Sequence, residues 1–210
     1  MSTCVLGVVL TAALAMACGS SGTHPDDMSA EAHREAAAGE EREAAEHQSH
    51  YDEDTGDGTG QHGVDPALYY GIDVYNPTRE HRREARQHRL LAEQHRSAAA
   101  ALEAFEEQEC ARFPPETRAI CPLLGQLASI EDVEGGVRLR FADGVRENAI
   151  AAHMRCHLAF GRTHGREGMD LCPLYVDGAS VGSNDGITLT TSAGDDAVAE
   201  LRRRSRAHAP

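Results

Sequence analysis

The segment His153-Met154-Arg155-Cys156-His157 holds residue types that bind transition metals. Residues at positions i, i+3 and i+4 of a helix share one face, so a helix here would point His153, Cys156 and His157 in the same direction. Imidazole nitrogens and a thiolate are the ligands of many zinc and copper sites. The spacing therefore indicates a candidate metal site, with zinc or copper as the ion.

Four cysteines offer a competing chemistry. They are Cys110, Cys121, Cys156 and Cys172. In an oxidising compartment an even number of cysteines predicts disulfides, and four cysteines allow three pairings. We expect the nearest-neighbour pairing, Cys110–Cys121 with Cys156–Cys172, in which each closed loop contributes roughly 3 kcal/mol in the chain-entropy model. A bonded Cys156 can neither bind a metal ion nor act as a thiol nucleophile, so the disulfide hypothesis competes with both alternatives.

Three further histidines, His81, His88 and His95, recur every seven residues. Seven residues of helix span about 10.5 Å, so neighbours in this column are too far apart to share one ion bound at about 2 Å. Packing against histidines of another helix, such as His33 or His47, would instead give a ladder of weak metal sites. The interpretation that we prefer is a polar seam between solvated helices. Packed histidines would titrate at about pH 6 to 7 and make such a helix pair sensitive to pH.

Two helical segments are available to position these histidines. Thr78 at the start, and Pro114 and Pro115 after the end, predict one helix from about Arg79 to Cys110. The segment Met28–His50 consists mostly of Ala, Glu, Arg and His, with high helix propensity and almost no apolar face. It predicts a solvated helix or stalk. We expect the amino-terminal half of the long helix to project or to pair with this segment.

The hydrophobic pattern is richest at residues 110–207, where a short motif occurs twice. Cys121-Pro122-Leu123 recurs as Cys172-Pro173-Leu174, and each copy leads into a hairpin-like alternation and then a helix. The expected strands are Leu127–Val133, Val137–Phe141, Ala179–Val181 and Ile187–Thr191, and the expected helices are Glu147–Thr163 and Asp195–Arg206. This order predicts an α+β fold, with a long N-terminal helical region followed by a small domain of two ββα repeats.

An Asp- and Gly-rich linker at 51–77 separates the two helical segments. Its aspartates suggest a calcium loop, but Gly56 and Gly63 stand where an EF-hand loop that begins at Asp52 requires oxygen ligands. We therefore expect a solvated, turn-rich linker. The predicted domain organisation is a signal peptide at 1–17, a flexible tether at 18–27, a helical stalk at 28–109 and an α+β domain at 110–207.

The amino terminus carries an apolar run of 13 residues, Val5–Ala17, which ends at Cys18 and the tether Gly19-Ser20-Ser21-Gly22. The run is shorter than the roughly 20 residues of a membrane-spanning helix. A short apolar run closed by small residues is typical of an export signal. Ala15-Met16-Ala17 also fits ordinary signal peptidase, which would cut at the same place, before Cys18.

The same residues resemble the lipobox of bacterial lipoprotein precursors. Ala17 and Cys18 match that motif, whereas Ala15 stands where leucine is usual and the first residues lack Arg and Lys. The resemblance implies that residues 1–17 are removed and that Cys18 carries acyl chains such as palmitate. It implies a place on the bacterial cell envelope, anchored to a membrane and facing the periplasm, with the outer membrane favoured. Two acyl chains hold a protein on a membrane more durably than one.

The composition excludes several functions. The chain of 210 residues has 34 acidic and 20 basic residues and a formal charge of −14, which argues against a nucleic-acid binder. No P-loop, G-x-S-x-G, H-E-x-x-H or dinucleotide motif is present, so we expect no enzyme and no cofactor. The expected function is a non-catalytic binding or structural role in the envelope, with the membrane and an envelope protein as partners. The alternative is a periplasmic metal-binding or metal-sensing protein that uses zinc or copper.

Overall fold

The computed structural model describes residues 22–56, 76–123, 127–183 and 186–208. The expected signal peptide, the candidate lipidation site Cys18 and residues 57–75 of the linker lie outside these ranges. Within the described ranges, no helix combines the length and the hydrophobicity that crossing a membrane requires.

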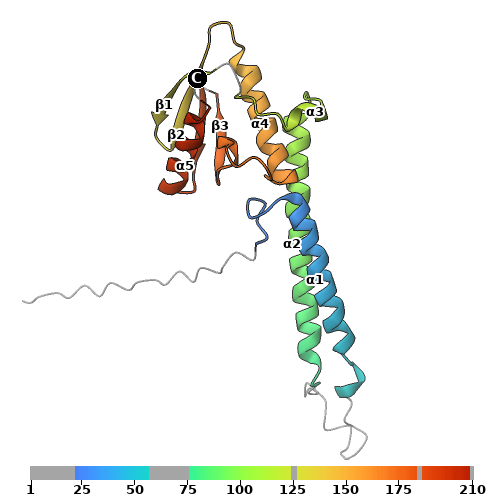
Figure 1. Ribbon diagram of the computed structural model, residues 1–210. Coiled ribbons are helices and arrows are strands. Elements are labelled where there is room, and N and C mark those ends of the chain that lie inside the picture. The colour runs from blue at the N-terminus through green and yellow to red at the C-terminus, as the bar shows by residue number, and fades with distance from the viewer. Residues whose placement is uncertain (1–21, 57–75, 124–126, 184–185, 209–210) are drawn as a thin grey trace, which may run out of the picture.

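Two long helices form an antiparallel hairpin (Figure 1). They are α1, Ala30–His50, and α2, Arg79–Cys110, which has the range that the sequence predicts. The side chain of Ser29 caps α1 by accepting a hydrogen bond from the amide of Ala32. The buried positions between the helices are mainly alanines, among them Ala37, Ala44, Ala85 and Ala92. These small side chains leave space at the interface for the larger histidines.

Thr78 links the two helices at the end of the hairpin where the chain passes from α1 to α2. Its hydroxyl does not cap α2 but accepts a hydrogen bond from the Asp52 amide and donates one to the Asp52 carbonyl. Asn76 donates from its side chain to the same carbonyl. These bonds tie the residues after α1 to the residues before α2.

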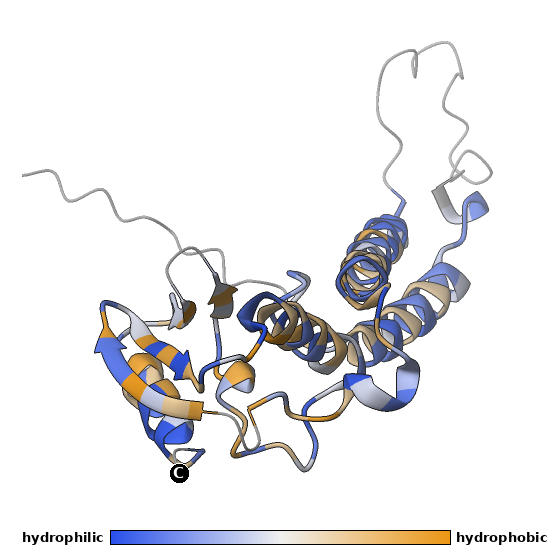
Figure 2. Cartoon of the chain, turned by 90° about the horizontal axis from the view of Figure 1, so that it is seen from above, coloured by the Kyte–Doolittle hydropathy of each residue, from blue (hydrophilic) through white to orange (hydrophobic). Residues whose placement is uncertain are grey.

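The second part of the chain contains a four-stranded antiparallel sheet. Its strands are β1, Leu127–Val133; β2, Gly136–Phe141; β3, Ala179–Gly182; and β4, Ile187–Thr191, in the spatial order β1-β2-β4-β3. Hydrophobic and hydrophilic residues alternate along the strands in Figure 2, which is the pattern of a sheet with one buried face. Gly136 permits the close approach of β2 to β4, because a Cβ there would lie 1.9 Å from the Leu189 carbonyl oxygen. The prediction of a mixed helix and strand fold is therefore confirmed.

Helices cover the sheet and join it to the hairpin. They are α3, Pro115–Arg118; α4, Glu147–His164; and α5, Asp195–Arg206; short 3-10 turns occur at Asp54–Gly56 and Pro173–Tyr175. Helix α5 packs on the sheet, and its Arg202 donates to the carbonyls of Val133 and Gly136. Helix α4 packs along α2. The largest core side chains are Leu123, Leu139, Met154, Leu174, Ile187, Leu189 and Leu201.

The disulfide pairing differs from the nearest-neighbour prediction. Cys110 at the end of α2 is bonded to Cys156 on α4, 46 residues away, with Cα atoms 4.7 Å apart. The predicted pairs Cys110–Cys121 and Cys156–Cys172 are therefore wrong. Because α2 packs along α4, Cys110 at the end of α2 faces Cys156 on α4. Cys121 lies further on, in a hydrogen bond with the thiol of Cys172, and both are free.

Candidate metal centre

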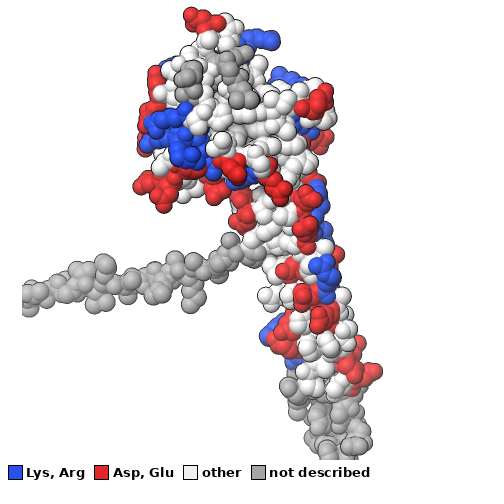
Figure 3. Space-filling view, viewed as in Figure 1, with Lys and Arg blue, Asp and Glu red and all other residues white. Residues whose placement is uncertain are grey.

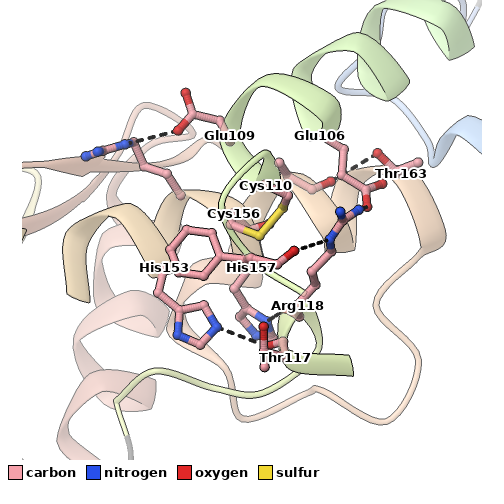
Figure 4. Close-up of a disulfide and its surroundings, with 12 residues drawn as sticks. Glu106, Glu109, Cys110, Thr117, Arg118, His153, Cys156, His157 and Thr163 are labelled. Carbon is pink, nitrogen blue, oxygen red and sulfur yellow. Dashed lines mark hydrogen bonds and ion pairs between the residues drawn. A yellow bond between two sulfur atoms is a disulfide. The ribbon is translucent and has the colours of Figure 1, made fainter. Parts of the chain in front are cut away.

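The predicted metal site at His153, Cys156 and His157 is not formed. The sulfur of Cys156 is bonded to Cys110, and both imidazoles donate hydrogen bonds to backbone carbonyls (Figure 4). His153 Nε2 lies 2.9 Å from the Thr117 oxygen, and His157 Nδ1 lies 2.8 Å from the Arg118 oxygen. The three side chains hold helix α4 against α2 and against the turn of α3, so this prediction is corrected to a structural role.

His157 is a buried neutral histidine. It is 1% exposed, and its ring stacks on Tyr175 with centroids 5.0 Å apart. Burial lowers the pKa of His157, because the charged imidazolium would lose its hydration. Packing and one hydrogen bond therefore account for its position in the core.

The helical histidines meet across the hairpin. On α2, His81, His88 and His95 all face α1, where His81 lies against His47 and His95 against His33. His88 donates to the carboxylate of Glu40 over 2.6 Å. The heptad column thus lies on the face of α2 that meets another helix. The sequence suggests His33 and His47 only as examples of partner histidines within the ladder of weak metal sites, which is not the preferred interpretation.

Two of these histidines and a carboxylate converge near the end of the hairpin where the chain passes from α1 to α2. His47 Nδ1 lies 3.3 Å from His81 Nδ1 and 3.0 Å from Glu84 Oε2, and His81 Nδ1 lies 3.6 Å from the same carboxylate oxygen. His81 and Glu84 are three residues apart on α2 and so share a face, and His47 comes from the last turn of α1. We call these three residues the histidine cluster.

The distances within the cluster suit a tetrahedral ion. Zinc bonds of about 2.0 to 2.1 Å in a tetrahedron place neighbouring ligand atoms about 3.3 Å apart. The three separations in the cluster, 3.0, 3.3 and 3.6 Å, surround this value. Without an ion, the two shorter separations, from His47 to Glu84 and from His47 to His81, are within the range of hydrogen bonds. Two imidazoles and one carboxylate would leave a fourth position open for water or another ligand.

The cluster is accessible and has further imidazoles beside it. The side chains of His47, His81 and Glu84 are 25, 40 and 37% exposed, so an ion can enter from solvent. His88 stacks on His47 at a centroid distance of 5.3 Å, and His50 lies 5.3 Å from His81. Neither Glu84 nor His50 was predicted as a member of this group. The spacing His81-x-x-Glu84 was the available signal.

The other histidine pair is closed to solvent. His33 and His95 are 0 and 4% exposed, and their Nδ1 atoms lie 3.0 Å apart. Burial lowers the pKa of His33, and a positive charge on His95 would lower it further. His33 is therefore packed as a neutral imidazole against His95 inside the hairpin.

Within the described residues, the histidine cluster is the one group of three His, Cys, Asp or Glu side chains whose ligand atoms all lie within 4.8 Å of one another. Its donor set, two imidazoles and a carboxylate, is one that zinc and copper accept. Comparisons of the chain with protein-family models, with curated proteins and with solved structures find no match.

Proposed function

We propose that this chain is a cell-envelope lipoprotein whose helical hairpin binds a transition-metal ion at His47, His81 and Glu84 in a non-catalytic role. The observation that carries the proposal is the convergence of the three ligand atoms within 4.8 Å. Zinc and copper are the preferred ions, since imidazole nitrogen suits both and a carboxylate completes the set.

The charge of the chain supports a cationic ligand. The formal charge is −14, and Figure 3 shows acidic side chains spread along the hairpin between the basic ones. An excess of negative charge raises the local concentration of divalent cations and so favours their capture. The cluster itself contributes the carboxylate of Glu84.

Binding at this place would couple the ion to the shape of the hairpin. His47 belongs to α1, whereas His81 and Glu84 belong to α2, so one ion would join both helices near the end where the chain passes from α1 to α2. A ligand that binds only the folded state stabilises it, by about 2.7 kcal/mol at a free concentration one hundred times its dissociation constant. Binding of a metal ion would therefore change the stability of the hairpin, which suits a metal-sensing protein or a protein that stores metal ions reversibly.

The anchor is the second part of the proposal. The apolar run Val5–Ala17, the small residue Ala17 and the following Cys18 support lipidation, and the described chain reaches α1 only eight residues after Gly22, at Ala30. We expect Cys18→Ser to release the protein from membranes of its host. A Cys18→Ser variant that still sediments with membranes would contradict the anchor without touching the metal proposal.

We further propose that the sheet part consists of two related ββα units. The first contains β1, β2 and α4, the second contains β3, β4 and α5, and each follows a Cys-Pro-Leu motif. The second strands of the two units, β2 and β4, pair at the centre of the sheet. This arrangement supports a duplicated unit.

Elemental analysis tests the metal proposal most simply. Full chain that has been loaded with zinc or copper and dialysed should retain about one ion per chain. A double variant, His47→Ala with Glu84→Ala, should retain none. Retention of the ion by the double variant, or loss of the ion by the unaltered chain, would contradict the proposal.

A further inference from the structure

A cavity of about 850 Å³ lies where the end of α2 meets the start of α4. Arg112, Arg146 and Arg155 line it, and Phe113, Val145 and Ala152 add apolar wall. Its volume is within the range of about 300 to 1,000 Å³ that is usual for small-molecule sites. The single acidic lining residue is Glu147, so arginines outnumber carboxylates here, in contrast to the chain as a whole.

Two of the three arginines, Arg112 and Arg146, have no partner among the residues that the structure describes. Carboxylates outnumber arginines 34 to 20 in this chain, and all 20 arginines lie in described ranges. Among these residues nearly every guanidinium makes a hydrogen bond, an ion pair or a ring contact with its neighbours. The exceptions are Arg42, Arg86, Arg112 and Arg146. Arg112 and Arg146 are 34 positions apart in the sequence, yet both line the same cavity.

The walls of the cavity are fixed in place. The disulfide Cys110–Cys156 joins the two helices directly beside it, two residues before Arg112 and one residue after Arg155. Arg155 Nε lies 3.2 Å from the carboxylate of Glu109, which adds an ion pair between α2 and α4. Two charged groups without partners are thus held on a rigid frame, which lowers the entropy cost of binding a ligand.

We propose that this cavity binds an organic anion, whose carboxylate or phosphate group is held by Arg112 and Arg146. Guanidinium groups match these two anions because their N–H donors form paired hydrogen bonds with two oxygens. An apolar body of the ligand would lie against Phe113, Val145 and Ala152. Asn148 and Ala149 also line the cavity, at the amino-terminal end of α4, where the helix dipole adds a favourable field for an anion.

The anion site is independent of the metal site. His81 is near the start of α2 and Cys110 is at its end, and the 29 residues between them in the numbering span about 44 Å of helix. The two sites share no residue. Failure of one proposal therefore leaves the other untouched.

Calorimetric titration of the full chain in a non-ionic detergent at low salt tests the inference. The probes are phenyl phosphate and benzoate as anions with an apolar body, inorganic phosphate as an anion without one, and benzylamine as a cation of similar size. We expect at least one of the two aromatic anions to bind, more tightly than inorganic phosphate, and benzylamine not to bind. Binding of benzylamine as tight as that of the aromatic anions, or no binding of either aromatic anion, would overturn the proposal. An affinity for inorganic phosphate equal to that for the aromatic anions would overturn the proposed contact between the ligand and the apolar wall of the cavity.

Paired variants assign the effect to the cavity. Arg112→Ala with Arg146→Ala should weaken binding of the aromatic anion by about tenfold or more, since two charge-assisted hydrogen-bonding groups are lost. The matched control is Arg42→Ala with Arg86→Ala, which removes the two other arginines without partners and the same charge. Both arginines of the cavity are exposed, so thermal melting should show that the two double variants are equally folded. Equal weakening in both would mean a general charge effect and would contradict the site.

Discussion

His47 on α1 and His81 on α2 place their Nδ1 atoms 3.3 Å apart, and one oxygen of Glu84 lies within 3.6 Å of both. Two imidazoles this close cannot both carry a proton on the facing nitrogens. One must accept, or an ion must lie between them. The two helices of the hairpin therefore meet at a point where protons and metal ions compete for the same nitrogens.

The stability of the hairpin should fall as the pH falls. The folded-state pKa of His33 lies below its ordinary value of 6.5, because of burial and of His95, so the unfolded chain binds the proton more strongly. Stability from this group is thus complete above about pH 6.5 and is lost as the pH drops below that value. We expect the melting temperature to fall between pH 7.5 and pH 5, and to fall less in His33→Leu. The exposed His24→Leu serves as the control, and an unchanged pH dependence in His33→Leu would refute the assignment.

Loss of the disulfide should destabilise the fold strongly. A cross-link across 46 residues contributes about 4 kcal/mol in the chain-entropy model. We expect Cys110→Ser with Cys156→Ser to lower the free energy of unfolding in urea by about this amount. Cys121→Ser with Cys172→Ser, which removes two free thiols, should cost clearly less when both variants are compared with the unaltered chain, all freshly purified and without reductant so that the Cys110–Cys156 bond stays intact where it can form. An equal or smaller loss in the Cys110 and Cys156 variant would contradict the pairing.

The two remaining cysteines should join on mild oxidation. The hydrogen bond from the Cys172 thiol lowers the pKa of Cys121 to about 6, so Cys121 is the thiolate that attacks. Treatment with glutathione disulfide should convert the two thiols into one Cys121–Cys172 disulfide, with two glutathione thiols released and two hydrogens lost from the protein. Peptide mass mapping before and after treatment checks this. Thiols at both positions that persist with an excess of the oxidant would show that the pair is held apart.

Two helical glycines should respond in opposite directions to alanine. A Cβ at Gly161 on α4 would lie 2.2 Å from the buried ring of Tyr175, so Gly161→Ala should cost about 1 to 3 kcal/mol through overpacking. A Cβ at Gly39 on α1 would lie 3.7 Å from its nearest neighbour, a terminal nitrogen of Arg42. Gly39→Ala should therefore stabilise α1 by about 0.5 to 1 kcal/mol, because alanine has the higher helix propensity. Urea denaturation of both variants checks the signs, and a stabilised Gly161→Ala would refute the close contact.

Local chemistry explains which parts of the fold were predictable. The carboxyl-terminal bound of α2 follows from Pro114, which has no amide hydrogen to donate to the Cys110 carbonyl, whereas Thr78 precedes α2 without capping it. The strands follow from alternation, as Val137, Leu139 and Phe141 face the core and are separated by arginines. Each of these signals lies within a few residues of the feature that it predicts.

The disulfide pairing and the metal ligands depend instead on how helices pack. Cys110 meets Cys156 because α2 lies along α4, and no local pattern encodes that contact. His153 and His157 share a face of α4, as the spacing predicted. The carbonyls that accept hydrogen bonds from them belong to the short helix α3, which the spacing does not predict. The histidine cluster combines a predicted column on α2 with His47, whose position opposite His81 is set by the alignment of the two helices.

Calorimetric titration with zinc and with copper at pH 7.5 tests most directly whether the hairpin binds a metal ion through His47, His81 and Glu84. The unaltered full chain should bind one equivalent, and His81→Ala and Glu84→Gln should each weaken the affinity by about tenfold or more. His24→Ala, which removes an exposed imidazole near the start of α1, should bind as the unaltered chain does. No binding of either ion, or the same affinity in His81→Ala as in the unaltered chain, would contradict metal binding at the histidine cluster.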